Sequence, residues 1–211
     1  MPNDLATLNA KLVTQLRDTG STLVWASTEK DDLLTWAMAS LWPRFSRPLD
    51  PAVATVALVA DTYFYALPAG VRAVSRVDYI DASGNEFGPL HGKSWEIAGD
   101  AFYGTGKLHV APAIVAQGGT LRLNGYGIYD GTTNLIPDIL VPLVLATARA
   151  EAYRRVAGNR AKFEEWLTVN QVQNVSVNEL TQLVNEADNE MQRLKAQLPR
   201  TWQKPVPGRQ G

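Results

Sequence analysis

The amino-acid sequence predicts an α+β fold, in which a bundle of about four helices carries an inserted antiparallel β module and an extended C-terminal tail. Apolar residues recur at helical spacing in residues 4–42 and again in residues 134–198. Between these regions lies a stretch rich in Val, Thr, Tyr, Leu and Gly, broken by turn signals. The first two helices are too short to stand alone. We therefore expect them to pack against the later helices, which makes the β module an insertion in a helical domain.

Domain boundaries are predicted where the composition changes. We expect residues 1–50 and 130–199 to form the helical domain, residues 51–129 the inserted β domain, and residues 200–211 a flexible arm. A chain of 211 residues, 45% of them hydrophobic, can bury one substantial core, or one core and a smaller satellite. It contains no cysteine, so it must fold without disulfides. Its formal net charge of −1 gives no indication of a nucleic-acid-binding protein.

The first helix is predicted at residues 4–18, with Asn3 or Asp4 as its N-cap. Its apolar residues are three or four positions apart and share one face: Leu5, Leu8, Leu12 and Leu16. This spacing is typical of a short amphipathic helix.

The second helix is predicted to start after Ser27 and Thr28, where Thr28 with Asp31 comes close to a capping box, and to end before Pro43. Trp36 and Trp42 flank its apolar stripe. We expect both tryptophans to pack in the core or at its rim. The alternative is that either of them anchors an interface.

Residues 51–129 are expected to form antiparallel strands joined by short loops. Near their end, Leu121 and Leu123 alternate with Arg122 and Asn124, which predicts one buried and one solvated face. Six strands are predicted: Val53–Leu58, Thr62–Ala66, Val71–Ile80, Trp95–Ala98, Lys107–Val110 and Thr120–Tyr129. Loops are expected at residues 82–85, 98–100 and 117–119.

A helix predicted at residues 141–157 organises the helical domain, because it returns the chain from the β module. One apolar stripe along it consists of Val141, Leu145, Ala148, Ala152 and Val156. The opposite, polar face is expected to carry Thr147, Glu151, Arg154 and Arg155. Pro142 suits the first turn of a helix, and Gly158 can adopt the left-handed turn that ends one.

Two further helices are predicted after this one. Residues 159–173 carry Phe163 and Trp166 along one side, and Ser176 with Glu179 forms a capping box for the last helix. The apolar residues of the last helix repeat about every 3.6 positions: Leu180, Leu183, Ala187, Met191, Leu194 and Leu198. The sequence leaves open whether the two helices are continuous.

The tail, residues 200–211, is basic, rich in Pro and Gly, and free of acidic residues. Such a segment cannot bury enough surface to fold by itself. It is either a frayed terminus or an arm that becomes ordered on a partner. In the second case Trp202 would be the anchor, with Arg200, Lys204 and Arg209 as supporting charges.

Motifs for enzyme chemistry are not convincing anywhere in the sequence. Gly99 and Gly104 have the separation found in a phosphate-binding loop, but the Lys and Ser/Thr that must follow are missing. The two histidines, His91 and His109, lack the spacing of metal ligands on a helix and are expected to be surface or half-buried strand residues. We therefore expect no catalytic residues and no enzyme activity.

Cofactor and metal sites are not predicted either. Asp78, Asp81 and Asp100 could approach one another, but they lack the spacing of a calcium loop, and solvated turn carboxylates are far more common. The most apolar run, residues 135–148, is shorter than the roughly 20 residues needed to span a bilayer. No signal peptide is evident. A protein made in the cytoplasm, without a membrane partner, is expected.

Several local patterns occur here in a characteristic order. An early helix with tryptophans reads DLLTWAMASLWPRF, and a strand that leads into a Leu-Pro turn reads TYFYALPAGVRAVSRVDYID. A strand followed by proline reads KLHVAPAI, and its hairpin partner reads TLRLNGYGIYD. An alanine-rich helix introduced by Ile-Pro reads LIPDILVPLVLATARAEAYRRVAG. Over residues 31–198 this order resembles the head-to-tail connector adaptor proteins of tailed bacteriophages, from which the chain departs at Pro142.

The resemblance implies a structural virion protein of the neck, or connector, assembled in the host cytoplasm. Such adaptors form a ring, typically of twelve identical subunits, that binds the portal, extends the DNA channel and provides the platform for the tail. The implied partners are the portal protein, tail or tail-completion proteins and other copies of the chain. Genomic DNA would pass through during ejection without sequence-specific readout.

The resemblance also assigns roles to parts of this chain. The helical domain would build the ring, and the arm would dock on the portal through Arg200, Trp202, Lys204 and Arg209. The polar face formed by Glu151, Arg154 and Arg155 would then meet either solvent or a neighbouring subunit.

Two alternatives come from other functional classes. One is a β-rich ligand- or carbohydrate-binding module of a virion or other assembly. It is favoured by aromatic residues that we expect to be exposed: Tyr63, Tyr65, Trp95 and Tyr103. The other is an enzyme with an unrecognised site, which the shortage of His and the lack of Cys disfavour.

Overall fold

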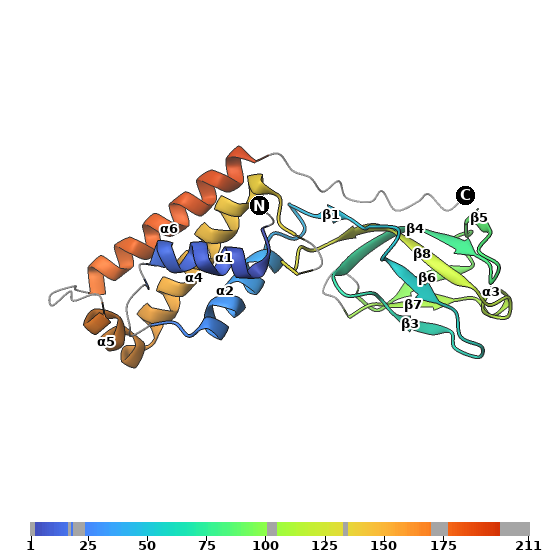
Figure 1. The fold of residues 1–211 in the computed structure, drawn as a ribbon, viewed down its shortest axis with the longest axis horizontal. Coiled ribbons are helices and arrows are strands. Elements are labelled where there is room, and N and C mark those ends of the chain that lie inside the picture. Colours follow the sequence, from blue (N-terminus) through green and yellow to red (C-terminus); the bar gives the residue numbers. More distant parts are fainter. Residues whose placement is uncertain are drawn as a thin grey trace. The chain divides into compact units, whose positions relative to one another are not determined.

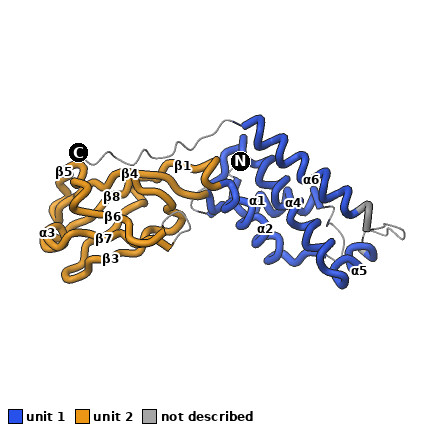
Figure 2. The backbone as a smooth tube through the Cα atoms, turned by 180° about the vertical axis from the view of Figure 1, so that it is seen from behind, with its two compact units in different colours: residues 1–41, 129–199 blue, residues 42–128, 200–211 orange. Residues whose placement is uncertain are grey.

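The structure is a computed structural model of the chain, and it describes residues 3–16, 18, 24–100, 105–132, 135–169 and 177–198. Among these residues, α-helices and antiparallel sheets are both present, which confirms the α+β class (Figure 1). They form two compact units: a helical unit that contains residues 1–41 and 129–199, and a β unit that contains residues 42–128 (Figure 2). The chain thus leaves the helical unit after residue 41 and returns to it at residue 129.

In the described part of the helical unit there are five α-helices and one short 3₁₀ helix. They are α1 (Leu5–Leu16), α2 (Ser27–Ala39), η1 (Asp138–Leu140), α4 (Val141–Gly158), α5 (Arg160–Val169) and α6 (Val177–Gln197). The simpler description of a bundle of about four helices is not confirmed.

Side-chain oxygens fix the starts of α1 and α2. The Thr7 N–H donates a hydrogen bond to Asp4 Oδ1 at 2.8 Å, so Asp4, one of the two predicted residues, is the N-cap of α1. At α2 the N-cap is Ala26, whose N–H donates to Glu29 Oε2 at 2.9 Å. The capping box predicted at Thr28 is wrong, because the N-cap is Ala26, two residues earlier, and Glu29, the third helical residue, accepts the hydrogen bond from the Ala26 N–H.

Helix α4 lies at the centre of the helical unit, in contact with α1, α2, α5 and α6. The predicted apolar stripe is buried along its whole length, as expected. Thr147, predicted on the polar face, is however buried and only 2% exposed, because neighbouring helices cover the first half of α4 on several sides. Its hydroxyl donates a hydrogen bond to the Leu143 carbonyl at 2.7 Å, which satisfies the polar group inside the core.

The sequence predicted the start of α4 correctly and its end wrongly. Pro142 stands in the first turn, as predicted. Gly158 is the last helical residue, but its backbone is not left-handed, so the predicted glycine ending is wrong. Asn159 instead adopts an extended conformation with φ −131°, and its Oδ1 accepts the Lys162 N–H at 3.2 Å, at the start of α5.

The predicted link between the last two helices lies outside the described residues. Helix α5 ends at Val169, and α6 begins at Val177. Both Ser176 and the side chain of Glu179 are outside the described part, so the predicted capping box and the continuity of the helices stay predictions.

The β unit contains two antiparallel sheets. A five-stranded sheet has the order β1-β8-β4-β5, with β2 also paired to β8, and a three-stranded sheet has the order β3-β7-β6. The strands are β1 (Arg47–Pro48), β2 (Thr55–Ala57), β3 (Phe64–Ala66), β4 (Val71–Ile80), β5 (Glu86–Pro89), β6 (Trp95–Ala98), β7 (Lys107–Val110) and β8 (Thr120–Gly127). A short helix, α3 (Pro112–Val115), precedes β8.

Three of the six predicted strands have the observed bounds, namely β4, β6 and β7. Strands β1 and β5 were not predicted, because β1 has only two residues and β5 contains Gly88 and Pro89, which are typical of turns. Helix α3, a single turn that begins at Pro112, was not predicted either. Very short elements of this kind leave no periodic signal.

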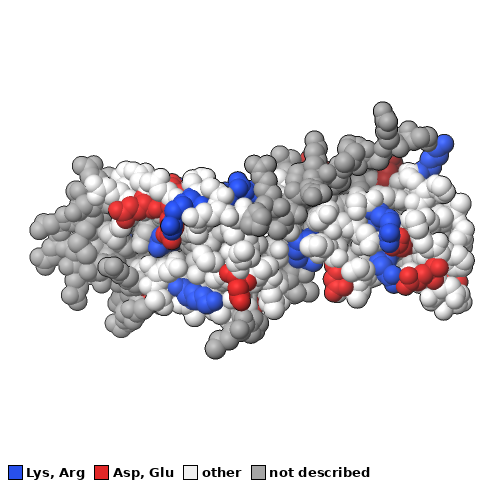
Figure 3. Space-filling view, turned by 90° about the horizontal axis from the view of Figure 1, so that it is seen from above, with Lys and Arg blue, Asp and Glu red and all other residues white. Residues whose placement is uncertain are grey.

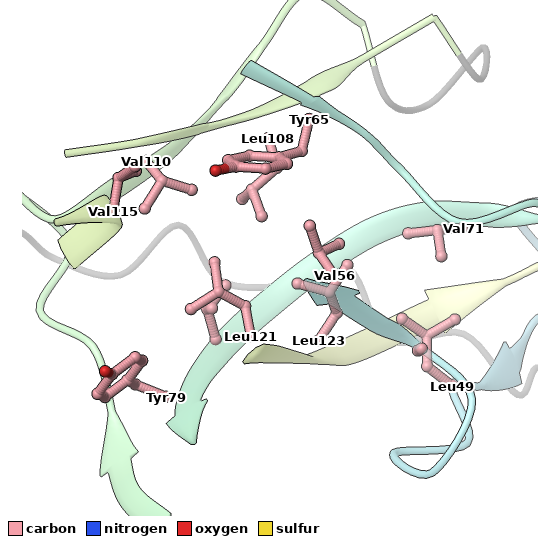
Figure 4. Close-up of a cluster of buried hydrophobic side chains, with 12 residues drawn as sticks. Leu49, Val56, Tyr65, Val71, Tyr79, Leu108, Val110, Val115, Leu121 and Leu123 are labelled. Atoms are coloured by element: carbon pink, nitrogen blue, oxygen red, sulfur yellow. The ribbon is translucent and has the colours of Figure 1, made fainter. Parts of the chain in front are cut away.

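The core of the β unit lies between its two sheets. Side chains from β3 and β7 and side chains from β2, β4 and β8 point into one space (Figure 4). The buried cluster comprises Leu49, Ala54, Val56, Tyr65, Val71, Val77, Tyr79, Leu108, Val110, Val115, Leu121 and Leu123. The predicted alternation is confirmed, since Leu121 and Leu123 are fully buried while Arg122 and Asn124 face outward.

Candidate interaction surfaces

The predicted interface residues of α4 lie together, and their charges are partnered within the chain. Arg154 Nη2 forms an ion pair with Asp188 Oδ1 of α6, and Arg154 Nη1 lies 3.5 Å from Glu151 Oε2. Arg155 Nε lies 3.3 Å from Glu151 Oε1, in the i, i+4 arrangement expected from the sequence. Asp188 raises the pKa of the Arg154 guanidinium by accepting its hydrogen bond. This face of α4 is therefore directed partly at α6.

A second ion pair between α4 and α6 escaped the sequence analysis. Arg149 Nη2 of α4 pairs with Glu190 Oε2 of α6. The sequence did hold a signal, because Arg149 lies in a run of small, largely buried residues and a cation there needs a partner. Asp188 and Glu190 of α6 thus both connect this helix to α4.

A buried ion pair joins the end of α1 to α2. Lys30 Nζ lies 2.9 Å from Asp18 Oδ2 and donates to the Trp25 carbonyl at 2.9 Å. Asp18 Oδ1 accepts the Val24 N–H at 2.9 Å. Both charged side chains are nearly inaccessible, at 3% and 0% exposed. This arrangement satisfies the buried charges and fixes the connection between the helices.

The outer face of the five-stranded sheet carries a polar network. Asp78 Oδ2 accepts hydrogen bonds from Arg76 Nη2 and Asn124 Nδ2, both at 2.8 Å. Beside it, Arg122 Nη2 donates to Glu86 Oε1 at 2.7 Å, and this bond lowers the pKa of the Glu86 carboxyl. The network links β8 with its neighbour β4, and also with β5 on the far side of β4, through charges of both signs.

The aspartates considered as a cation site have other roles. Asp81 Oδ1 accepts the N–H groups of Ser83 and Asn85 at 2.9 and 2.8 Å, which closes the loop between β4 and β5. The side-chain hydrogen bond from Asn85 lowers the pKa of Asp81. Among the described residues, no group of three His, Asp or Glu side chains could hold a metal ion.

Besides Val53 and Phe87, three large apolar residues that are exposed in the described part of the β unit gather around the connection between β2 and β3. They are Val59, Tyr63 and Phe64, at 57%, 37% and 55% exposed. The Phe64 ring lies 4.8 Å from the ring of His109, whose Nδ1 is 3.2 Å from Glu96 Oε1. His109 is thus a half-buried strand residue, one of the two positions predicted for it.

The aromatic set predicted for carbohydrate binding is not assembled. Tyr65 is buried, at 8% exposed, and its hydroxyl donates to the Thr62 carbonyl at 2.6 Å, so the prediction that it is exposed is wrong. The alternation of β3 turns Tyr65 inward and its neighbour Phe64 outward. Trp95 is half-buried against the β core, and Tyr103 lies outside the described residues. Only Tyr63 of the four is exposed in the described part.

Three large apolar side chains are exposed in the described part of the helical unit. Trp36 of α2 is 43% exposed, Leu135 42% and Ile139 60%. Trp36 therefore lies at the rim of the helical core, and its alternative role as an interface anchor stays a prediction. Trp42 is half-buried.

The predicted portal-binding residues lie outside the described part of the chain: Arg200, Trp202, Lys204 and Arg209. On the face shown in Figure 3, acidic and basic side chains lie next to one another and do not gather into a patch of one sign. None of the helices in the described ranges has the length and apolar character that crossing a membrane requires.

Comparison with known families gives one result that covers nearly the whole chain. The model of the family described as SU10 adaptor protein matches residues 3–205. This range includes both compact units. No curated protein sequence matches the chain.

Proposed function

The chain belongs to the SU10 adaptor protein family of phage head–tail adaptors, and from this membership we propose that it forms a ring beneath the portal of the filled capsid. In this position it binds the portal, extends the DNA channel and provides the attachment platform for the tail. The observation that carries the proposal is the extent of the family match, which spans both units and reaches residue 205. A likeness of this extent applies to the whole architecture and not to a single domain.

The helical unit, residues 1–41 and 129–199, is proposed as the ring body. Its helices are tied to one another by ion pairs, from α4 to α6 through Arg149 and Arg154 and from α5 to α2 through Lys162. These ion pairs between helices support a role as the frame of the ring. The β unit, residues 42–128, is inserted in the sequence of this frame, and residues 200–211 are proposed as the arm that docks on the portal.

The proposed partners are the portal protein, tail or tail-completion proteins and further copies of the chain, twelve in the complete ring. The ring occupies the neck of the virion and is assembled in the host cytoplasm. During ejection, genomic DNA passes through it without sequence-specific contacts. In support, the arginines of α4 are neutralised by carboxylates, so this surface offers no row of unpaired cations to a phosphate backbone.

We propose a structural and not an enzymatic role. The ion pairs that the structure describes in the β unit lie within one sheet: Arg76 with Asp78 in β4, and Arg122 of β8 with Glu86 of β5. Each pair stabilises a sheet surface, and this use of charge supports a scaffold.

Mixing the full-length protein with purified portal complexes tests this function. Electron cryomicroscopy should show a ring of twelve adaptors seated on the portal. Portal particles that stay bare at a saturating concentration of the adaptor would overturn the proposal.

The docking arm has a separate test. Deletion of residues 200–211 should abolish portal binding, and Trp202→Ala should weaken it, because a buried aromatic anchor contributes more than the charges around it. Asn189→Ala, on the exposed side of α6, is the matched control and should bind like the wild type. If the deletion variant bound the portal like the wild type, residues 200–211 would not be the docking arm, whereas the proposed ring would be unaffected.

A further inference from the structure

The chain returns from the β unit to α4 through residues 135–140, which we call the return segment. A buried asparagine from a distant part of the sequence holds this segment. Asn3, 5% exposed, donates from Nδ2 to the Ile136 carbonyl at 3.1 Å and to Asp138 Oδ1. The Asn3 carbonyl accepts the Ile136 N–H at 3.4 Å. One residue thus binds both the backbone and a side chain of the return segment.

The orientation of the Asn3 amide is fixed from the side of α1. Its Oδ1 accepts a hydrogen bond from Lys11 Nζ of α1 at 3.0 Å. Because the oxygen faces this ammonium, the NH₂ group faces the return segment, where its two N–H groups have two acceptors. Asn3 therefore connects α1 to the return segment and has its side-chain donors satisfied.

A backbone contact lies beside Asn3 and leaves little room for a side chain. The Leu5 N–H donates to the Gly131 carbonyl at 2.8 Å. Gly131 has φ +70°, and a Cβ at this position would lie 3.4 Å from Leu5 N and 3.2 Å from Met38 Sδ. Such a left-handed backbone suits glycine. We name the whole set the Asn3 clasp; it comprises Asn3, Leu5, Gly131, Ile136 and Asp138.

The return segment does little to hold itself in place. Its helix η1 is a single turn, in which the Leu140 N–H donates to the Pro137 carbonyl at 2.9 Å. Within the described chain, neither η1 nor α4 has a side-chain hydrogen bond at its N-cap. A helix start without a cap leaves backbone donors unsatisfied and needs tertiary contacts. Here the Asn3 clasp provides such contacts, together with the buried side chains of Ile136 and Leu140.

The body of α4 is held by other contacts. It packs against α2, α5 and α6. Arg149 and Arg154 also pair with acids of α6. Opening of the Asn3 clasp would leave these contacts in place. A segment whose contacts are few and separate from the main core can open on its own, at a lower free energy than the whole unit.

We infer that the Asn3 clasp is a conformational device with a closed and an open state. In the closed state it fixes the return segment on α1. In the open state the return segment and the first turn of α4 are released, while the body of α4 stays packed against α6. Release lengthens the free connection between the β unit and the helical unit, so the chain can loosen this connection without unfolding either core. The inference does not depend on the proposed ring.

Introduced thiols can detect the open state, because the chain contains no cysteine. In the free full-length protein, Ile136→Cys places a thiol in the return segment and Val156→Cys places one in the body of α4. Both side chains are buried, at 2% and 0% exposed, so a water-soluble thiol reagent reaches them only when the structure opens. The Ile136→Cys variant should react on the order of tenfold faster than the Val156→Cys variant.

Asn3→Ala should shift the equilibrium towards the open state. It removes two buried hydrogen bonds to the return segment, so the Ile136→Cys thiol should react roughly tenfold faster still. The rate of the Val156→Cys thiol should not change. Asn9→Ala is the matched control, because Asn9 of α1 donates instead to Asp31 of α2 at 2.6 Å. It should leave the rate of the Ile136→Cys thiol unchanged.

An exchange of donor and acceptor separates hydrogen bonding from packing. Asn3→Asp keeps the size of the side chain but sets a second carboxylate against Asp138, so labelling of the Ile136→Cys thiol should accelerate. The additional change Asp138→Asn restores a donor between the two positions and should reverse part of this acceleration. A role of Asn3 in packing alone would give neither effect.

Three outcomes would overturn the inference. One is equal acceleration of both thiols by Asn3→Ala, which would mean that the helical unit opens as a whole. The others are an unchanged rate of the Ile136→Cys thiol and an exchange that rescues nothing. Hydrogen exchange of residues 135–140 in the Asn3→Ala protein, compared with that of residues 149–156, gives the same test without a cysteine in the core. The inference can therefore be decided even if the fold does not tolerate Ile136→Cys.

Discussion

The helical unit and the β unit use their charged side chains differently. In the described helical unit, ion pairs join separate helices, from α4 to α6, from α5 to α2 and from the end of α1 to α2, besides pairs within one helix such as Arg155 with Glu151. In the described β unit, the ion pairs lie within one hydrogen-bonded sheet: Arg76 and Asp78 belong to β4, and Arg122 of β8 reaches Glu86 of β5 across β4. A helix satisfies its backbone internally, so only side chains connect it to its neighbours. Loss of a charge should therefore disturb the helical unit more.

The largest effect is expected at the buried pair of the helical unit. Lys30→Met leaves Asp18 buried without its cation, which should lower the free energy of unfolding of this unit by about 3–5 kcal/mol. Hydrogen exchange of α1 and α2 measures the loss. The additional change Asp18→Asn removes the orphaned charge but keeps an acceptor for the Val24 N–H, and it should recover much of the stability.

Arg76→Met is the matched control in the β unit. It also removes the cation of a buried aspartate, but the Arg76 side chain is 57% exposed and Asn124 still donates to Asp78. The cost should stay below about 1 kcal/mol. Equal losses in the two units would contradict the comparison.

The two apolar cores should respond separately. Leu143→Ala in α4 and Leu121→Ala in β8 each empty a fully buried site and should cost about 2–5 kcal/mol. Because each side chain belongs to the core of its own unit, hydrogen exchange should accelerate in that unit alone. If Leu121→Ala also accelerated exchange in α4, the units would share one folding transition, and the comparison between them would lose its basis.

How much of this architecture the sequence could predict depends on the kind of signal. Strand β4 and the apolar stripe of α4 were predicted because long periodic runs leave little ambiguity. The burial of Thr147 was not, since a helix covered on several sides loses the contrast between faces, and small residues such as Ala and Thr fit either environment. Periodicity reports that a face is apolar, but it does not report how many neighbours a helix has.

The candidate surfaces were predictable only in part, because they depend on contacts between distant residues. The sequence placed Glu151, Arg154 and Arg155 on one face of α4, and only the fold shows that Asp188 of α6 meets this face. The exposure of Tyr65 was misjudged for the same reason, since a strand of three residues does not indicate which side faces the core. The segment before α4 is held by Asn3, which lies 133 residues away from Ile136 in the chain.

A smaller effect should distinguish the ties between helices from those between strands. Arg149→Met removes the pair with Glu190, so α6 should loosen against α4 by about 0.5–1 kcal/mol, measured by hydrogen exchange of α6. Arg122→Met removes the pair with Glu86, and its side chain is similarly covered, at 26% exposed against 23% for Arg149. Exchange in β8 should not change, because β8 keeps its backbone bonds to β2 and β4. Faster exchange in β8 than in α6 would reverse the comparison.

The smallest effect is expected from acid at the tie between α2 and α5. Burial acts to raise the pKa of the Glu29 carboxyl, but hydrogen bonds from Lys162 and from the Ala26 N–H outweigh it and lower the pKa. A lowered pKa in the folded state means that the carboxylate stabilises the fold above its usual pKa of about 4.3, and that this contribution is lost as the pH falls through the folded value. Because the side chain is 42% exposed, the contribution should stay below about 1 kcal/mol.

Glu29→Gln should therefore lower the stability of the helical unit at pH 7 and make no difference at about pH 2, where both proteins carry a neutral side chain at this position. Urea unfolding followed by hydrogen exchange of α5 measures the difference, and a gap between the two proteins that persists at the lower pH would show that packing, not charge, holds α5 to α2.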